Sequence, residues 1–551
     1  MSDIRALADR YYSQWLAAHP LAATSNGIPG YDDRVPDDSE AGAEQRRAEL
    51  EGFRQEAQAM QAEAGADDAV TLGCLIGSAG AELAQIASAP LEHTVTAMPF
   101  SGPANLFGVA ARTPLGSPTA AADFLARLRA SGGWVDQLTE RLKAGAAKGR
   151  YPVAVVTDQA VAWAEKLLAA DVPAPLTAPQ PPEGWEGAGA WRDARDDAAR
   201  QVVKPALARY VDGLKELRAQ ARDDVHVGLV HLPGGEEDYA RAIRAHTTLP
   251  LTAEELHRTG MEELARLEAR CLGLGATIGL SDLPAIHRAM RAAAAAADPE
   301  AAIGAAIGAV RRAEGRAAEV FPQPLPGPCD VTPMPEVVAA SGMAPHYTPP
   351  RQDGSRPGTY WFNSLRPTAG TGWDLEGVAF HETVPGHHLQ LSRSLLLTDL
   401  PELQRHGGFT VFAEGWGLYA EQLAEEMGLY SGTEALLGAM ANALMRACRL
   451  VVDTGMHGLG WSRQQALEFF TGHVPMPEAF LANEIDRYII WPGQALAYLT
   501  GKLEIARLRD EAQRALGPGF DLTQFHAAVL DHGSLPMPVL ERVVREWCGT
   551  A

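Results

Sequence analysis

Cysteine and positive charge are both scarce in this sequence. Its 551 residues include only five cysteines, which form no Cys-x-x-Cys pair and show no metal-ligand spacing. An odd number of scattered cysteines is typical of free thiols in a reducing compartment and argues against a disulfide framework. The 47 lysines and arginines are outnumbered by 69 aspartates and glutamates, which gives a net charge of −22. Because this charge repels phosphate groups, we expect no nucleic-acid partner and no docking to an anionic membrane.

Long hydrophobic runs and nucleotide-binding motifs are absent as well. Charged residues stand at positions 3, 5, 9 and 10, where a signal peptide would need an apolar stretch. No window reaches the roughly 18 apolar residues that a transmembrane helix needs. No phosphate loop of the form GxxxxGK[ST], no GxGxxG after a strand and no GxSxG elbow occurs. The sequence therefore predicts a cytoplasmic globular protein without these nucleotide-binding or serine-hydrolase motifs.

Helix-forming patterns, by contrast, are abundant. The segment 39–65 is rich in Ala, Glu, Gln and Arg, and apolar residues recur with helical spacing in 118–148 and 155–170. Thr252 and Glu255 form a capping box that begins another helix. These patterns predict a mostly α-helical fold.

Strand-forming composition is confined to two segments, 345–351 and 358–364, which lie on either side of a turn-rich stretch. We therefore expect one small β-sheet just before residue 376. The Pro/Gly-rich stretch 172–189 is the best candidate for a surface loop. It allows a subdivision of the chain into an N-terminal helical part (1–175) and a part carrying the chemistry (190–551), although we expect residues 1–551 to form one large unit.

One segment carries a chemical motif. Residues 381–388, HETVPGHH, resemble the HExxH helix of zinc peptidases with residues inserted before the second histidine. In HExxH, histidines at i and i+4 face one metal ion, and the glutamate between them acts on water whose pKa the metal lowers. We therefore assign His381 as a metal ligand and Glu382 as the general base.

Two histidines compete for the second ligand position. On a regular helix His387 is roughly 120° out of phase with His381, whereas His388 is nearly in phase but about 10.5 Å away along the axis. Pro385 and Gly386 disfavour a regular helix, because proline lacks a backbone donor and glycine accepts unusual dihedral angles. A bulge there would place His387 where an i+4 histidine stands. We favour His387 as the ligand and keep His388 as the alternative ligand or as a substrate-binding residue.

A catalytic zinc site needs a third protein ligand and one open position. Glu414, in FAEGWGLYAEQLAEE, lies 33 residues after His381, which is enough chain for a helix, a loop and a returning helix. Glu421, two turns later on the same helix face, is either a ligand or a partner of one. Imidazole and carboxylate ligands together favour zinc, and we expect one ion per chain.

HETVPGHH and FAEGWGLYAE together resemble the bacterial domain-of-unknown-function family numbered 885, and the similarity extends over almost the whole chain, through tracts such as NEIDRYIIWPGQALAY and HGSLPMPVLERVV. That family is similar in fold to helical zinc carboxypeptidases of the Taq type, which are related to neurolysin-like oligopeptidases and to angiotensin-converting enzyme. The resemblance implies a large helical body with a central cleft and a metal at its floor. It also implies the roles of ligand, base, ligand and ligand for His381, Glu382, His387 and Glu414.

In those peptidases a tyrosine, often with a histidine or an arginine, stabilises the oxyanion and holds the substrate carboxylate. By the same resemblance we expect Tyr488 to donate to the oxyanion, and Arg487 and Tyr498 to bind substrate. A competing interpretation makes Tyr488 a packed core residue and Arg487 a surface ion-pair partner. Arg446 and Arg449, at i and i+3, either clamp a carboxylate or form ordinary ion pairs.

The sequence thus predicts a zinc-dependent hydrolase of peptide bonds, either a carboxypeptidase or a small-peptide peptidase. Its expected partner is a peptide or a peptide-like small substrate, and its oligomeric state is not defined by the sequence. Two alternatives remain. One is an amidase or ester hydrolase of non-peptide substrates with the same metal site, and the other is a catalytically silent protein that binds peptides or small ligands in the cleft.

Overall fold

The computed structural model describes residues 3–296, 298–334, 336, 339, 343–352, 354, 356–365 and 371–550. Helices make up most of these residues, and the strands among them form a single small sheet. The prediction of a mostly α-helical fold with one small sheet is therefore confirmed.

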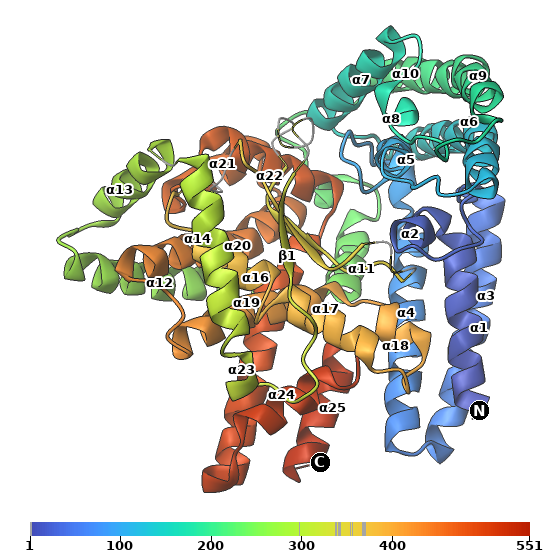
Figure 1. The fold of residues 1–551 in the computed structure, drawn as a ribbon. Helices are drawn as coiled ribbons and strands as arrows, with labels where there is room; N and C mark the ends of the chain where they lie inside the picture. The colour runs from blue at the N-terminus through green and yellow to red at the C-terminus, as the bar shows by residue number, and fades with distance from the viewer. Residues whose placement is uncertain are drawn as a thin grey trace.

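The first half of the chain is helical from its start. Its α-helices are α1 (Asp3–Ala18), α2 (Pro20–Ser25), α3 (Glu40–Met60), α4 (Ala66–Ser88), α5 (Gly102–Ala110), α6 (Pro118–Ala147), α7 (Ala154–Ala169), α8 (Ala174–Thr177), α9 (Ala188–Ala198), α10 (Lys204–Arg218), α11 (Gly235–Thr247) and α12 (Ala253–Thr277). Figure 1 shows α1, α3 and α4 side by side along one edge of the molecule, with α6, α7, α9 and α10 gathered above them. The capping box of Thr252 and Glu255 begins α12, as the sequence predicts.

The second half supplies the centre of the molecule and its C-terminal end. Its α-helices are α13 (Leu283–Ala295), α14 (Pro299–Glu314), α16 (Leu375–Glu382), α17 (His387–Leu396), α18 (Glu402–His406), α19 (Thr410–Glu426), α20 (Thr433–His457), α21 (Arg463–His473), α22 (Glu478–Ile490), α23 (Ala497–Leu516), α24 (Leu522–Leu530) and α25 (Met537–Cys548). Helix α19 packs against α16 and α23, and α20 packs against α12 and α16. In Figure 1, α16, α19 and α20 lie at the middle of the molecule, which is where the candidate site forms.

The small sheet has the order β1–β3–β2. Strand β1 (Asp330–Pro333) runs parallel to β3 (Thr359–Phe362), and β2 (His346–Thr348) runs antiparallel to β3 on its other side. Composition correctly located β2 and β3, whereas β1, inside a proline-rich stretch, was not predicted. The turn residues Asp353 and Ser355 lie outside the described residues. Tyr360 and Phe362 anchor the sheet, since both are fully buried in the core.

Two hydrophobic cores hold the molecule together, and each draws on distant parts of the chain. Trp134, Leu207 and Leu444 belong to one of them. Leu7 and Val544, near opposite ends of the sequence, belong to the other. The stretch 172–189, predicted as a surface loop, contains α8 and the start of α9, and one core includes residues from both sides of it.

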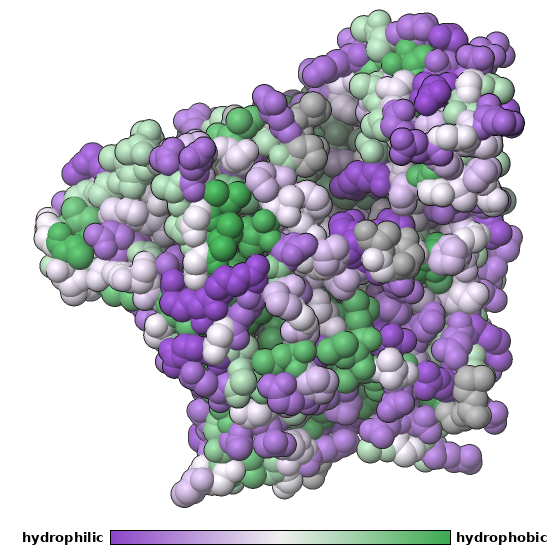
Figure 2. Space-filling model, in the orientation of Figure 1, coloured by the Kyte–Doolittle hydropathy of each residue, from purple (hydrophilic) through white to green (hydrophobic). Residues whose placement is uncertain are grey.

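The outer surface is polar, with separate apolar patches, as Figure 2 shows for one face. Two helical segments are nevertheless long and apolar enough to cross a bilayer by length and composition alone, namely Ala66–Glu92 and Thr433–His457. By this criterion of length and composition, the prediction that no segment is apolar enough for a transmembrane helix is wrong. The second segment, α20, has 83% of its most apolar window buried in the protein, so core packing accounts for its composition.

A buried carboxylate on α20 fixes the chain between α22 and α23. Asp453 is fully buried and accepts a hydrogen bond from the hydroxyl of Tyr239 at 2.7 Å. Its two oxygens also accept the backbone N–H of Gly493, at 3.1 and 3.2 Å. Gly493 has a φ of +81°, which favours glycine. Burial outweighs these hydrogen bonds and raises the pKa of Asp453 to about 7.

This raised pKa predicts a pH-dependent stability. An unfolded aspartate has a pKa of about 3.9, so between about pH 4 and pH 7 the unfolded chain releases this proton while the folded chain retains it. The contribution is fully present below the unfolded pKa and is lost as the pH rises through about 7. Asp453→Asn should therefore show a smaller fall in Tm than the wild type between pH 5 and pH 8, as followed by circular dichroism. Asp136→Asn, at an exposed ion pair, is the control, and identical pH slopes for wild type and Asp453→Asn would contradict the assignment.

Candidate metal centre

The HETVPGHH segment is a broken helix. Helix α16 ends at Glu382 and α17 begins at His387, with an irregular turn at 383–386 between them. Only glycine fits at position 386, because a Cβ atom there would lie 1.9 Å from the carbonyl oxygen of His381. The backbone N–H of Gly386 donates to the carbonyl of Phe380 at 3.0 Å. The predicted interruption of the helix at Pro385 and Gly386 is therefore present.

This break brings His387 to His381. The centroids of the two imidazole rings lie 4.6 Å apart, and the rings are nearly perpendicular. Oε2 of Glu414, on α19, lies 3.6 Å from Nε2 of His381 and 3.5 Å from Nε2 of His387. Ligands placed tetrahedrally at about 2.1 Å from one ion are about 3.4 Å from each other. The three donor atoms therefore have the mutual spacing of a metal site.

His388 faces another part of the structure. Its Nε2 lies 2.7 Å from the carbonyl oxygen of Gly327, and its Nδ1 lies 3.0 Å from the hydroxyl of Tyr347. The residue is only 3% exposed. Because both ring nitrogens have partners, the geometry favours His387 over His388 as the second ligand, and it offers no open ring nitrogen of His388 for a substrate.

Helix α19 presents two carboxylates with a glycine between them. Oε1 of Glu421 accepts a hydrogen bond from Nδ1 of His381 at 2.9 Å, which leaves Nε2 of that histidine for a metal ion. Gly417 makes room for the imidazole, since a Cβ atom there would lie 2.5 Å from Cε1 of His381. Arg446 approaches Glu421 at 3.7 Å. Glu421 thus stands behind a candidate ligand rather than in the ligand set.

The charge balance of the cluster favours a cation. Burial acts to lower the pKa of His381, but its interactions with Glu414 and Glu421 outweigh burial and raise that pKa to about 9. Burial acts to raise the pKa of Glu414, but the two histidines outweigh it and hold that pKa well below its usual range. Glu414 is therefore ionised at neutral pH, and the cluster favours either a proton on His381 or a bound metal ion. The donor set of two imidazoles and one carboxylate fits zinc.

Glu382 lies at the end of α16, half-buried beside the cluster. Its Oε2 accepts the backbone N–H of Tyr347 at 2.8 Å, so the edge strand β2 fixes this carboxylate. The sequence did not point to Tyr347, because a three-residue strand has little pattern and the contact joins segments 35 residues apart. Gly417 was missed too, although its place between two glutamates at helical spacing is a usable signal.

Arg487 and Tyr488, on α22, belong to an ionic cluster with Glu484 of the same helix and Arg449 of α20. Tyr488 is fully buried, and its hydroxyl donates to Glu484 at 2.8 Å and accepts from Nε of Arg449 at 2.9 Å. Arg487 forms an ion pair with Glu484 at 3.0 Å. This placement matches the competing interpretation in making Tyr488 a packed core residue and Arg487 an ion-pair partner. Arg487 is nevertheless largely buried and not at the surface as that interpretation had it.

Tyr498 lies nearer to the candidate ligands. It is half-buried, and the guanidinium of Arg449 lies 4.3 Å from the centre of its ring. Burial raises the pKa of Tyr498, and the carboxylate of Glu414 raises it further, which places the two groups within electrostatic range. A substrate-binding role for Tyr498 stays a prediction.

Two histidines and a carboxylate on neighbouring helices define this chain as a large helical protein with a candidate metal centre. The chain belongs to the bacterial family of unknown function DUF885, which matches residues 20–544. The predicted resemblance to that family is thereby confirmed. None of the curated proteins compared with the chain matches it.

Two solved structures share the whole fold. A candidate lipoprotein from Colwellia psychrerythraea is 26% identical with a TM-score of 0.90, and the match covers 100% of this chain and 99% of that one. A candidate lipoprotein of unknown function from Shewanella oneidensis is 16% identical with a TM-score of 0.74, and the match covers 98% and 100%. The cytoplasmic location inferred from the sequence stays a prediction.

Metal analysis of two variants can show whether His387 or His388 is the second metal ligand. His387→Ala removes a donor atom 3.5 Å from Glu414, so the purified variant should lose stoichiometric zinc. His388→Ala removes a group bonded to Gly327 and Tyr347, so it should retain the metal. Plasma mass spectrometry measures the metal, and circular dichroism checks the fold. Retention by His387→Ala with loss by His388→Ala would transfer the ligand role to His388.

The space that Gly417 provides gives a second prediction. Gly417→Ala should displace the His381 ring and reduce metal affinity by roughly 10- to 100-fold, as loss of a partner behind a ligand does. Gly133→Ala, in the exposed face of α6 with no atom near the added methyl group, is the matched control and should bind metal normally. Affinity is measured by competition with a chromogenic chelator. Equal affinities of the two variants would show that the His381 ring does not depend on this space.

Proposed function

We propose that the chain is a zinc-dependent hydrolase of peptide bonds, either a carboxypeptidase or a small-peptide peptidase. The observation that carries the proposal is the meeting of His381, His387 and Glu414, with donor atoms 3.5 and 3.6 Å apart, next to an additional carboxylate that is not needed as a ligand. Resemblance to Taq-type carboxypeptidases suggests the peptide substrate, and this part of the proposal rests on that analogy.

His381, His387 and Glu414 would hold the ion. Zinc in such a site acts as a Lewis acid that lowers the pKa of water and polarises a carbonyl group. Glu421 orients His381 through its Nδ1, which would leave the lone pair of Nε2 available to the ion. The backbone N–H of Tyr347 holds one oxygen of Glu382 and leaves the other for a proton.

Glu382 is the proton carrier in this proposal. Its carboxylate takes a proton from the attacking water and returns it to the amine that leaves, so it ends each turnover ionised. Tyr498, within electrostatic range of Glu414, is better placed than the fully buried Tyr488 to meet the substrate carbonyl.

The role of Glu382 is testable by an isosteric change. Glu382→Gln keeps an oxygen that accepts the Tyr347 N–H, so the variant should fold and bind metal normally. It should nevertheless lose about 10²- to 10⁴-fold in hydrolysis rate, because glutamine takes no proton. Digestion of a peptide library, followed by mass spectrometry, measures the rate and the direction of cleavage together.

Glu434→Gln, an exposed residue at the start of α20, is the matched control and should keep full activity. Unchanged turnover in Glu382→Gln would remove its role as base. Cleavage of amides or esters but not peptides by the wild type would favour the non-peptide hydrolase. Metal and peptide binding without cleavage of any of them would favour the silent binding protein.

A further inference from the structure

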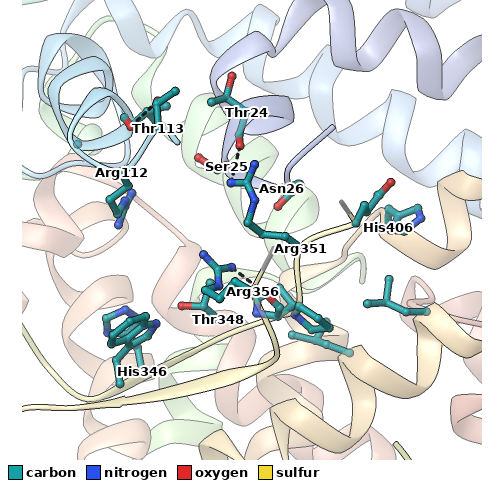
Figure 3. A pocket seen from close by; sticks show the side chains of 18 of the residues that line it. Thr24, Ser25, Asn26, Arg112, Thr113, His346, Thr348, Arg351, Arg356 and His406 are labelled. Carbon is teal, nitrogen blue, oxygen red and sulfur yellow. Dashed lines mark hydrogen bonds between the residues drawn. The ribbon is translucent and has the colours of Figure 1, made fainter. Parts of the chain in front are cut away.

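A cavity of about 650 Å³ lies between the N-terminal helices and the elements around the candidate metal centre. Helices α2 and α5 form one wall, and β2, α17 and α18 form the other. Figure 3 shows Arg112, just beyond the end of α5, on one wall and His346 of β2 on the opposite one. In the same view the guanidinium group of Arg351 reaches Thr24 at the end of α2, and that of Arg356 lies near Thr348.

Arginines give the lining positive charge, although the chain as a whole carries a charge of −22. Four arginines and two histidines line the cavity, namely Arg112, Arg351, Arg356, Arg405, His346 and His406. No aspartate or glutamate is among the described residues of the lining. Such an arrangement attracts an anion and disfavours a cation.

These arginines differ in the hydrogen bonds that they make within the protein. Arg351 donates to the carbonyl of Thr24 and Arg356 to that of Pro349. Arg405 donates to the carbonyl of Leu395, while its buried Nε has no hydrogen-bond partner in the described part of the chain.

Arg112 has the greatest freedom to bind a ligand. It is exposed, and within the described ranges no carboxylate forms an ion pair with it. Arg487, predicted from the sequence to bind a substrate carboxylate, is by contrast already paired with Glu484 at 3.0 Å.

The cavity shares strand β2 and helix α17 with the candidate metal centre, although its described lining includes neither the candidate ligands nor Glu382. His346 and Thr348 line it on either side of Tyr347, whose N–H holds Glu382. Gln390, also in the lining, stands three residues after His387, about 4.5 Å further along α17. Its side chain is 3% exposed, and its Oε1 has no hydrogen-bond partner among the described residues.

The remaining lining is largely apolar. Met334, Trp361, Leu391 and Leu395 contribute to it. A volume of this size accepts a ligand of a few residues, and apolar walls with a few polar groups are the usual composition of such sites.

We propose that this cavity binds the carboxylate of a peptide-like ligand with an apolar neighbouring side chain, and that Arg112 is its principal contact. This proposal rests on the proposed function, because peptide chemistry at the metal centre identifies the ligand class. The carboxylate is either the C-terminal group or an acidic side chain. Both make the same charge-assisted hydrogen bonds to a guanidinium group.

Binding to the Glu382→Gln protein, in its zinc-loaded form, tests the proposal without turnover. Three fluorescent probes are compared by anisotropy: an acetylated apolar tetrapeptide with a free C-terminus, its C-terminal amide, and the amide with one internal glutamate. Hydrogen bonds to charged groups contribute about 1.5–3 kcal/mol, so a carboxylate probe should bind about 10- to 100-fold more tightly than the uncharged amide. Which probe gains identifies the source of the carboxylate.

Arg112→Ala should abolish this preference, and Arg112→Glu should reverse it. Arg209→Ala, at an exposed ion pair elsewhere, is the control and should preserve it. Equal binding of all three probes to the unaltered cavity would overturn the proposal, as would a preference that survives both changes at Arg112. Displacement of the probe by inorganic phosphate at lower concentrations than the probe itself requires would also overturn it, in favour of a phosphate ligand.

The outcome is independent of hydrolysis. If the probes with a carboxylate bind more tightly but the wild type cleaves no peptide, the cavity is supported as a binding site and the proposed peptidase activity is contradicted. Cleavage of all three probes at equal rates by the wild type, with no preference among them in binding, would support the peptidase activity and remove the cavity as a carboxylate site.

Discussion

One buried imidazole, held between two carboxylates, organises the candidate site. His381 is 3% exposed and contacts Glu421 through Nδ1 and Glu414 through Nε2. Burial of an imidazole this deep is costly unless its polar atoms are satisfied, and α19 supplies both partners from a single helix face. Gly417 lies between the two carboxylates and gives the ring its space. The position of α19 against α16 therefore determines whether the three candidate ligands can meet at all.

The features of the site and the fold that depend on neighbouring residues could be predicted from the sequence. The HETVPGHH segment revealed the two histidines and the break at Pro385 and Gly386, because the dihedral preferences of proline and glycine are properties of those residues themselves. The mostly helical fold followed from composition and capping residues in the same way. Glu414 was found because its helix has a distinctive sequence, although its distance from His381 was not predictable.

The features that sequence reasoning missed depend on contacts between distant segments. The backbone N–H of Tyr347 donates to Glu382. Every residue except proline has such an N–H, so this contact could not be recognised from the residue type. Tyr488 and Arg487 were predicted to contact the substrate. Tyr488 is instead hydrogen-bonded to Glu484 and Arg449, and Arg487 forms an ion pair with Glu484. The cationic cavity assembles arginines from positions 112 to 405, each unremarkable in its own stretch of sequence. Tertiary arrangement, rather than local propensity, decides such pairings.

The interleaving of the two cores has a consequence for biosynthesis. Leu7 of α1 and Leu75 of α4 share one core with Val544 of α25. A nascent chain leaving the ribosome therefore cannot complete the core that contains α1 and α4 until α25 has been made. During that interval the part of this core that α25 completes stays open to the solvent and to other chains. Production of the folded protein then depends on keeping these early helices from aggregating, and a chain truncated before α25 lacks part of the core on which its own N-terminus packs.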